Sequence, residues 1–212
     1  DYTETSIELL GTEATYGAQG RMGECREVVV KISTAHLKKE ALVLFSREIA
    51  QAATGMAPGI TGIVGGRPTV WPKIRLYSCL VPKTEVSVAV DLGGGKQTVD
   101  VATDGGFEPS QLIEQSASAA APATDTTVPL IQLAWARSGD KGDHTNIGVI
   151  ARKAEFAPFI EVALTELAVA EWMAHTLHPE HGRVTRWALP GFQAFNFLLE
   201  HSLGGGGVAS LR

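Results

Sequence analysis

The chain of 212 residues is long enough for one large domain or two small ones. Hydrophobic residues make up 44% of it and charged residues 19%, so we expect a packed core rather than wholesale disorder. The net charge of −5 disfavours a nucleic-acid partner, which would call for a basic surplus. No apolar run approaches the roughly 18 residues of a membrane helix, so we expect no membrane partner and a cytoplasmic protein. Because the chain begins at Asp1, we expect a processed product or an excised segment.

The first part of the chain shows short, mixed patterns. Residues 28–32 alternate in polarity as a strand does, and residues 42–52 carry apolar side chains on one helical face. The runs 74–80, 86–90 and 99–103 are rich in β-formers and predict further short strands. The cysteines, Cys25 and Cys79, lie far apart, and we expect two buried, reduced thiols rather than a disulfide scaffold.

Small and polar residues dominate between residues 107 and 127, where apolar periodicity is lost. Such a segment buries too little surface to offset the entropy of ordering it, so it is predicted to be a linker. The predicted organisation is therefore a unit at 1–106, a linker at 107–127 and a second unit at 128–212.

The second unit has a clearer pattern of elements. The sequence predicts strands at 130–135, 147–151, 183–188 and 208–211, a helix at 160–177 and a short helix at 192–200. This order suits two helices packed on one face of an antiparallel sheet. The predicted fold class is α+β: two small α/β sandwich units, of which the C-terminal one is ferredoxin-like.

The richest chemistry lies between the first two of these strands, at 137–146. Glycines there allow backbone amides to point inward, and a segment anchored by strands at both ends can hold polar groups in place. The alternative is a solvated turn in which Asp and Asn side chains cap their own backbone. The candidate catalytic residues are Ser138, Asp140, Lys141, Asp143 and Asn146, with Arg137 as a ligand-binding candidate.

Two glycine-rich segments could bind an anion. The segment 59–68 combines glycines with an arginine fork, although it matches no dinucleotide or phosphate-loop motif; a structural loop is the alternative. The segment 204–207 offers consecutive amides that could form an anion nest; a flexible turn is the alternative. The ligand-binding candidates here are Gly62, Gly65, Gly66, Arg67, Asn196, Gly204, Gly205, Gly206 and Gly207.

Other classes of site find little support. His175, His178 and His181 are spaced by three, but Pro179 interrupts the helical geometry, so we expect surface histidines and no metal. His201 stands alone and carries no signal. The sequence lacks a nucleophile elbow and any nicotinamide or flavin fingerprint, so we expect no cofactor.

Several long motifs resemble the acyclic terpene utilisation family, AtuA. They are residues 136–143, 146–148, 151–152, 184–191, 196–197 and 203–207 in the second part, and 59–62, 65–68, 75–76 and 80–82 in the first. The resemblance implies a chain corresponding to the final third of longer proteins, with a C-terminal ferredoxin-like domain. It also implies a role in citronellol and geraniol breakdown through acyl-CoA intermediates, alongside a biotin-dependent carboxylase.

These observations lead to two hypotheses about function and one structural alternative. In the first, the chain is an enzyme or part of one, with lyase or hydro-lyase chemistry on a branched acyl-CoA or carboxylate. Asp140 or Asp143 would be the base, Lys141 and Asn146 would stabilise an enolate-like oxygen, and residues 205–207 would hold an anion. In the second, it is a non-catalytic assembly or regulatory module that docks a partner such as the carboxylase. We expect a homo-oligomer or a complex with the absent N-terminal region; a purely structural polar network at 137–146 is a third possibility.

Overall fold

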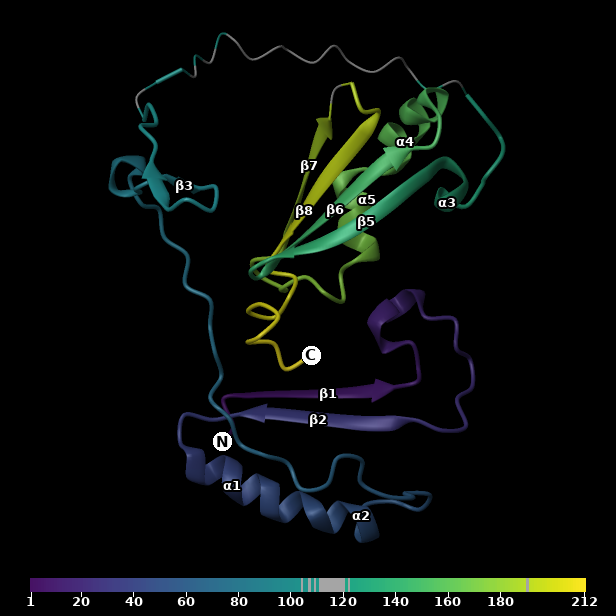
Figure 1. The fold of residues 1–212 in the computed structure, drawn as a ribbon. Coiled ribbons are helices and arrows are strands. Elements are labelled where there is room, and N and C mark those ends of the chain that lie inside the picture. The colour runs from purple at the N-terminus through teal and green to yellow at the C-terminus, as the bar shows by residue number, and fades with distance from the viewer. Residues whose placement is uncertain (104, 107, 109, 111–120, 122, 190) are drawn as a thin grey trace. The chain divides into compact units, whose positions relative to one another are not determined.

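The computed structural model describes residues 1–103, 105–106, 108, 110, 121, 123–189 and 191–212 (Figure 1). The chain divides into two compact units, Asp1–Leu76 with Ala119–Arg212, and Tyr77–Ser118. Much of the predicted linker at 107–127 lies outside the described residues. Among the helices that are described, none has the length and apolar character needed to cross a membrane.

The N-terminal part pairs two strands and adds a helix. Strands β1 (Glu4–Leu10) and β2 (Val29–Ala35) are antiparallel, and the short helix η1 (Ala14–Gln19) lies between them in the chain. Helix α1 (Lys39–Glu48) continues through η2 (Ile49–Gln51) into α2 (Ala52–Gly55). The predicted strand at 28–32 and helix at 42–52 are confirmed, whereas β1 was not predicted because only Ile7 and Leu9 alternate within it.

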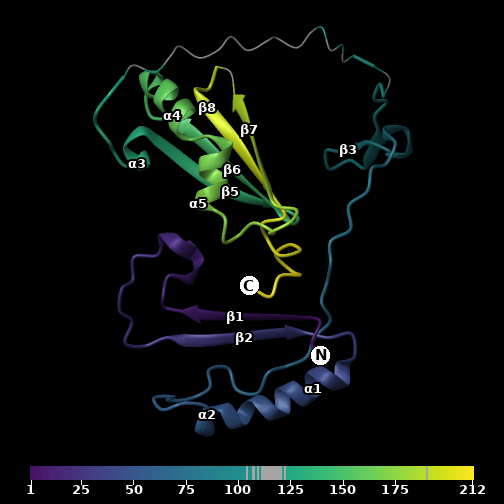
Figure 2. The ribbon, with the colours of Figure 1, turned by 180° about the vertical axis from the view of Figure 1, so that it is seen from behind.

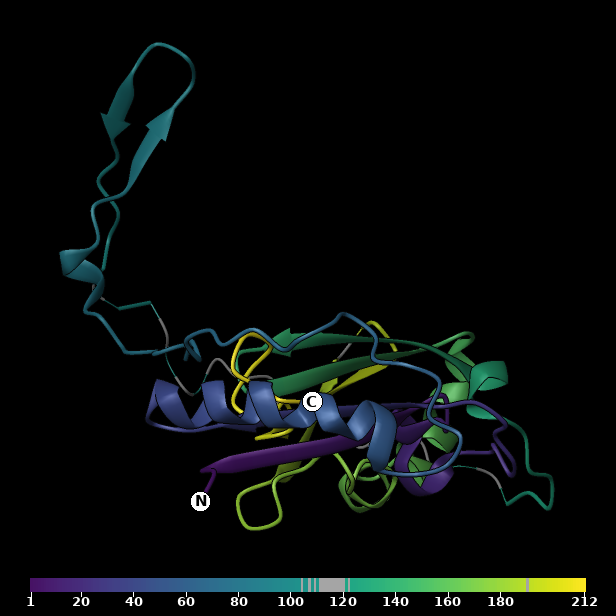
Figure 3. The same ribbon diagram turned by 90° about the horizontal axis from the view of Figure 1, so that it is seen from below.

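The unit Tyr77–Ser118 contains η3 (Lys83–Glu85) and a two-stranded ribbon of β3 (Ala89–Asp91) and β4 (Lys96–Thr98) (Figure 3). Gly93 and Gly95, with φ of 92° and 104°, form the turn of this hairpin. The strand prediction at 86–90 therefore holds only in part. The predictions at 74–80 and 99–103 are wrong, since those residues have no regular structure. The expectation of two buried thiols is also wrong, because Cys79 is exposed and Cys25 is only partly buried. β-propensity forms a strand only where a neighbouring strand completes its hydrogen bonds.

The C-terminal domain is an antiparallel sheet of four strands with helices on one face (Figure 2). The strands lie in the order β5-β6-β8-β7, and the chain runs β-β-α-α-β-β rather than the predicted β-β-α-β-α-β. Its elements are α3 (Leu130–Leu133), β5 (Ala134–Lys141), β6 (His144–Ala151), η5 (Ala154–Phe156), α4 (Ala157–Ala163), α5 (Glu166–Trp172), β7 (Arg183–Leu189) and β8 (Ala194–Glu200).

One face of this sheet forms the core. Phe195, Phe197 and Leu199 alternate along β8 and are at most 5% exposed. They pack in one cluster with Val149 of β6 and Ile160 of α4. Since side chains alternate across a strand, the intervening residues form a second, open face of the sheet.

Four element predictions in this domain are wrong, wholly or in part. Residues 192–200 form β8 and not a short helix, because the period-two burial of Phe195, Phe197 and Leu199 outweighs helical propensity. Residues 130–133 form a helical turn, so that the first strand starts at Ala134. Residues 208–211 begin in a turn and contain no strand. The single helix at 160–177 is split in two.

Thr165 causes that split. Its hydroxyl accepts a hydrogen bond from the Ala168 N–H at 3.1 Å and so caps the start of α5. The end of α4 is closed by Arg186 of β7, whose guanidinium donates to the carbonyls of Glu161 and Leu164. The two short helices are thereby fixed separately onto the sheet.

Candidate functional site

The polar residues at 137–146 belong to a hairpin and not to a long loop. They occupy the ends of β5 and β6, and the connection is the short turn at Gly142 and Asp143. Gly142 has φ of 66°, which suits glycine at this tight turn. In the register of the hairpin, Lys141 faces His144 and Asp140 faces Thr145.

Strand alternation distributes the candidate catalytic residues over both faces of the sheet. Lys141 and Asn146 share the open face, where the Lys141 Nζ donates to the Asn146 Oδ1 at 3.2 Å. Asn146 Nδ2 in turn donates to Asn196 Oδ1 of β8 at 3.4 Å. Ser138 and Asp140 have the strand parity of buried Ala134 and lie on the helix side. The structure therefore joins the side chains of Lys141, Asn146 and Asn196 but does not bring the side chains of Ser138 or Asp140 to them.

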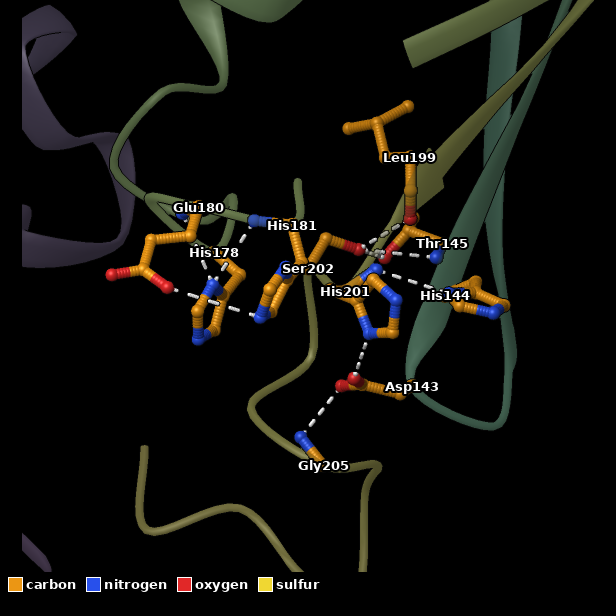
Figure 4. Close-up of polar contacts among 10 residues, drawn as sticks. All are labelled: Asp143, His144, Thr145, His178, Glu180, His181, Leu199, His201, Ser202 and Gly205. Atoms are coloured by element: carbon orange, nitrogen blue, oxygen red, sulfur yellow. Dashed lines mark hydrogen bonds and ion pairs between the residues drawn. The ribbon is translucent and has the colours of Figure 1, made fainter. Parts of the chain in front are cut away.

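Asp143 links the hairpin turn to the segment that follows β8 (Figure 4). Its Oδ1 accepts the Gly205 N–H at 2.6 Å, and its Oδ2 lies 2.9 Å from His201 Nδ1. Its backbone carbonyl accepts the N–H groups of Ser202 and Leu203. These contacts arise because β6 and β8 are neighbours, so that the start of β6 and the end of β8 meet at one edge of the sheet.

The environment keeps Asp143 ionised. Partial burial raises the pKa of this carboxyl, but the Gly205 hydrogen bond, the His201 hydrogen bond and the charges of His201 and His144 together outweigh burial, and the pKa is lowered below 3.8. A carboxylate in contact with imidazole Nδ1 requires that nitrogen to be the donor. The ring of His201 is therefore oriented with Nδ1–H toward Asp143 and Nε2 away from it.

His201 lies at the centre of a group of histidines. Its backbone N–H donates to His144 Nδ1 at 3.0 Å, and the two rings meet edge to face at 5.1 Å. His181 lies 6.1 Å from the His201 ring and stacks on His178 at 4.7 Å. Within the described residues, no three His, Cys, Asp or Glu side chains are arranged to hold a metal ion.

The backbone of His201 is strained and firmly held. Its φ of 50° lies in the left-handed region, which is uncommon outside glycine and clusters at functional sites. The next residue, Ser202, is 4% exposed, and its hydroxyl bonds the Thr145 N–H at 3.1 Å and the Leu199 carbonyl at 2.9 Å. This buried anchor fixes the strained position of His201 beside Asp143.

The anion bound by the glycine run at 204–207 is a side chain of the protein itself, the carboxylate of Asp143. The N–H of Gly205 is bound to Asp143, and that of Gly206 to the Leu203 carbonyl. A Cβ on Gly206, whose φ is 102°, would lie 3.3 Å from the Gly142 carbonyl oxygen. The glycines thus allow the segment to approach the hairpin turn closely. A ligand role for Gly204 and Gly207 stays a prediction.

The second glycine segment, at 59–68, belongs to the N-terminal part and has no regular structure. Gly65 and Gly66 have positive φ, and Gly62 is exposed. Arg67 Nε donates to the hydroxyl of Ser46 in α1 at 3.2 Å. None of the contacts described joins this segment to Asp143 or His201, so its role in ligand binding stays a prediction.

Sequence reasoning missed His201. Its partner is 58 residues away, and their contact follows only if residues 194–200 are a strand beside β6. A histidine directly after a strand with alternating phenylalanines, followed by a serine and a glycine run, was the available signal.

Two protein families match separate parts of this chain. Residues 1–92 match the model described as acyclic terpene utilisation family protein AtuA, and residues 128–212 match the AtuA ferredoxin-like domain. Both matched families carry the AtuA description. The AtuA match over residues 1–92 corrects the expectation that only the final third of the family is represented. The match to the AtuA ferredoxin-like domain spans the C-terminal four-stranded sheet. The comparisons with curated proteins and with solved structures give no match.

Proposed function

We propose that this AtuA-related protein is an acid–base enzyme of acyclic terpene utilisation that acts on branched acyl-CoA or carboxylate intermediates, with His201 as general base. The observation that carries the proposal is the 2.9 Å contact between His201 Nδ1 and Asp143 Oδ2. Carboxylate–imidazole pairs orient the ring and stabilise the imidazolium that forms when it takes a proton. The family match supports the pathway but not this chemistry.

The chemistry follows from the two ring nitrogens. Asp143 holds Nδ1–H, so Nε2 is the free basic atom, and the His201 side chain is 45% exposed and open to a substrate. Nε2 removes a proton from the carbon next to a thioester or carboxylate carbonyl, and the C–H electron pair forms a carbon–carbon double bond. The β-hydroxyl leaves with its electron pair and takes the proton from the imidazolium, which releases water and regenerates the base.

Lys141 is the proposed electrophile for the enolate-like oxygen. Its Nζ donates to Asn146 Oδ1 at 3.2 Å and to the Asp140 carbonyl at 3.0 Å, so two hydrogen bonds position this exposed ammonium. It lies opposite His144 in the hairpin register, at the same end of the sheet as His201. Of the two carboxylates considered, Asp143 is preferred to Asp140 because it contacts the imidazole.

The test is dehydration of branched 3-hydroxyacyl-CoA thioesters by the full chain, followed by the absorbance of the unsaturated product. The variant His201→Gln should lose about 100-fold or more of kcat/KM, the usual contribution of a general base. His181→Gln removes a neighbouring imidazole that does not contact Asp143 and should retain activity. Equal turnover by wild type and His201→Gln would show that His201 is not the base. Equal loss of turnover in His201→Gln and His181→Gln, with unchanged melting temperatures, would show that the effect is not specific to His201.

A further inference from the structure

The open face of the C-terminal sheet carries a row of four residues across all four strands. The pairing register places Arg137 of β5, Gly148 of β6, Asn196 of β8 and Trp187 of β7 side by side. Trp187 is 47% exposed, and Trp135, on the same face, is 51% exposed. An indole left open on a sheet face offers a flat apolar surface on which the ring of a ligand can stack.

Gly148 is a glycine that the fold itself does not require. It lies within a strand and has no positive φ, and an added Cβ would meet only the Arg137 carbonyl oxygen, at 3.9 Å. By contrast, a Cβ on Gly139 would lie 3.0 Å from Asn146 Oδ1. Glycine inside a strand costs about 0.5–1 kcal/mol relative to alanine. Gly148 therefore lowers stability and leaves an open space on the sheet, and close approach of another molecule explains such a glycine.

The charge of the open face favours an anionic ligand. The chain as a whole has a net charge of −5, yet the described open face gathers cations and a single carboxylate. By strand parity, the cations are Arg137, Lys141, Arg152 and Arg183, and the carboxylate is Glu200. The Arg152 guanidinium also lies over the Trp135 ring, 4.5 Å from its centre. Arginine offers a planar fork that matches phosphate oxygens.

The length of the row matches a ring joined to a phosphate. Three interstrand steps of about 4.8 Å separate Arg137 from Trp187, or about 14 Å in all. An exposed indole at one end can stack on a flat heterocycle, and the arginine at the other can bind a phosphate. The amide of Asn196 and the bare position of Gly148 lie between them.

We propose that the open face binds a nucleoside diphosphate group, with its ring on Trp187, its sugar over Gly148 and its phosphates at Arg137. The same chemistry is found in free nucleotides and in the nucleotide end of a coenzyme A thioester. Binding on the open face does not require His201 to be a base.

The test is calorimetric titration of the full chain with four probes: ADP, coenzyme A, adenosine and pyrophosphate. ADP and coenzyme A should bind, and adenosine and pyrophosphate, each with half of the group, should bind at least tenfold more weakly. Tighter binding of coenzyme A than of ADP identifies the thioester as the source, and the reverse order identifies a free nucleotide. Absence of ADP and coenzyme A binding, or equal binding of pyrophosphate, would overturn the proposal.

A pair of variants separates the site from the fold. Gly148→Val fills the bare position with a good strand former and should weaken ADP binding at least tenfold, while the melting temperature is kept or raised. Ala136→Val adds a valine to the helix-side face of β5 and should leave ADP binding unchanged. Undiminished ADP binding by Gly148→Val would contradict the placement. Because the readout is binding and not turnover, this failure is distinct from failure of the proposed catalytic function.

Discussion

The substitution Asp143→Asn tests how much the carboxylate stabilises the junction between the hairpin turn and the segment after β8. The carboxylate accepts from Gly205 at 2.6 Å and contacts His201 at 2.9 Å. Hydrogen bonds to a charged group contribute about 1.5–3 kcal/mol each and neutral ones about 0.5–1.5, so loss of charge costs about 1–1.5 kcal/mol per bond. Asparagine also turns one acceptor into an NH2 group.

Two such bonds give a loss of about 2–3 kcal/mol, and the lower end applies because the Asp143 side chain is 28% exposed. Equilibrium urea unfolding followed by tryptophan fluorescence should therefore show Asp143→Asn less stable than wild type by about 2 kcal/mol. The matched control is Asp140→Asn, the same change three residues earlier. Among the described contacts the Asp140 side chain has no partner, so the control should stay within about 0.5 kcal/mol of wild type.

Equal stability of the two variants would refute this reasoning, because the contacts of Asp143 would then contribute nothing beyond those of an exposed carboxylate. A loss common to both would point to the charge of the hairpin as a whole.

Three further predictions concern stability. Because the pKa of Asp143 is lowered in the folded state, its carboxylate stabilises the fold fully above the ordinary carboxyl value of 3.8, and this stabilisation is lost as pH falls through the lower folded value. Urea unfolding should therefore show that the difference in stability between wild type and Asp143→Asn shrinks below about pH 4. Gly206→Ala introduces a Cβ at positive φ, 3.3 Å from the Gly142 carbonyl oxygen, and should destabilise by about 1–3 kcal/mol in the same measurement, whereas Gly207→Ala, in open space, should not. Thr165→Ala removes the cap of α5 and should cost about 1 kcal/mol, and an unchanged midpoint would mean that the cap is dispensable.

The sequence predicted the fold class and the outline of the C-terminal domain well, for physical reasons. The alternating strand at 183–188 buries enough surface to decide its own structure, and the apolar stripe at 160–177 indicated helix without revealing its division into α4 and α5. Residues 192–200 were misassigned because their phenylalanines are compatible with a helix until a neighbouring strand is known. The short strands of the first part depend on pairing that no local pattern reports.

The candidate site was predicted as a cluster in sequence, but the structure sorts it by strand geometry. Residues adjacent along a strand point to opposite faces, which separates Asp140 from Lys141. The partner of Asp143 came instead from the far end of β8, in a residue with no motif of its own. Proximity across a sheet is a tertiary property, and strand order cannot be read from spacing.

The most direct test of His201 as a base is exchange of the α-proton of a branched 3-hydroxyacyl-CoA with D2O, measured by mass spectrometry on the full chain. If His201 is the base, wild type and His181→Gln incorporate deuterium, and folded His201→Gln incorporates it at least 100-fold more slowly. Incorporation by His201→Gln at the wild-type rate would contradict it.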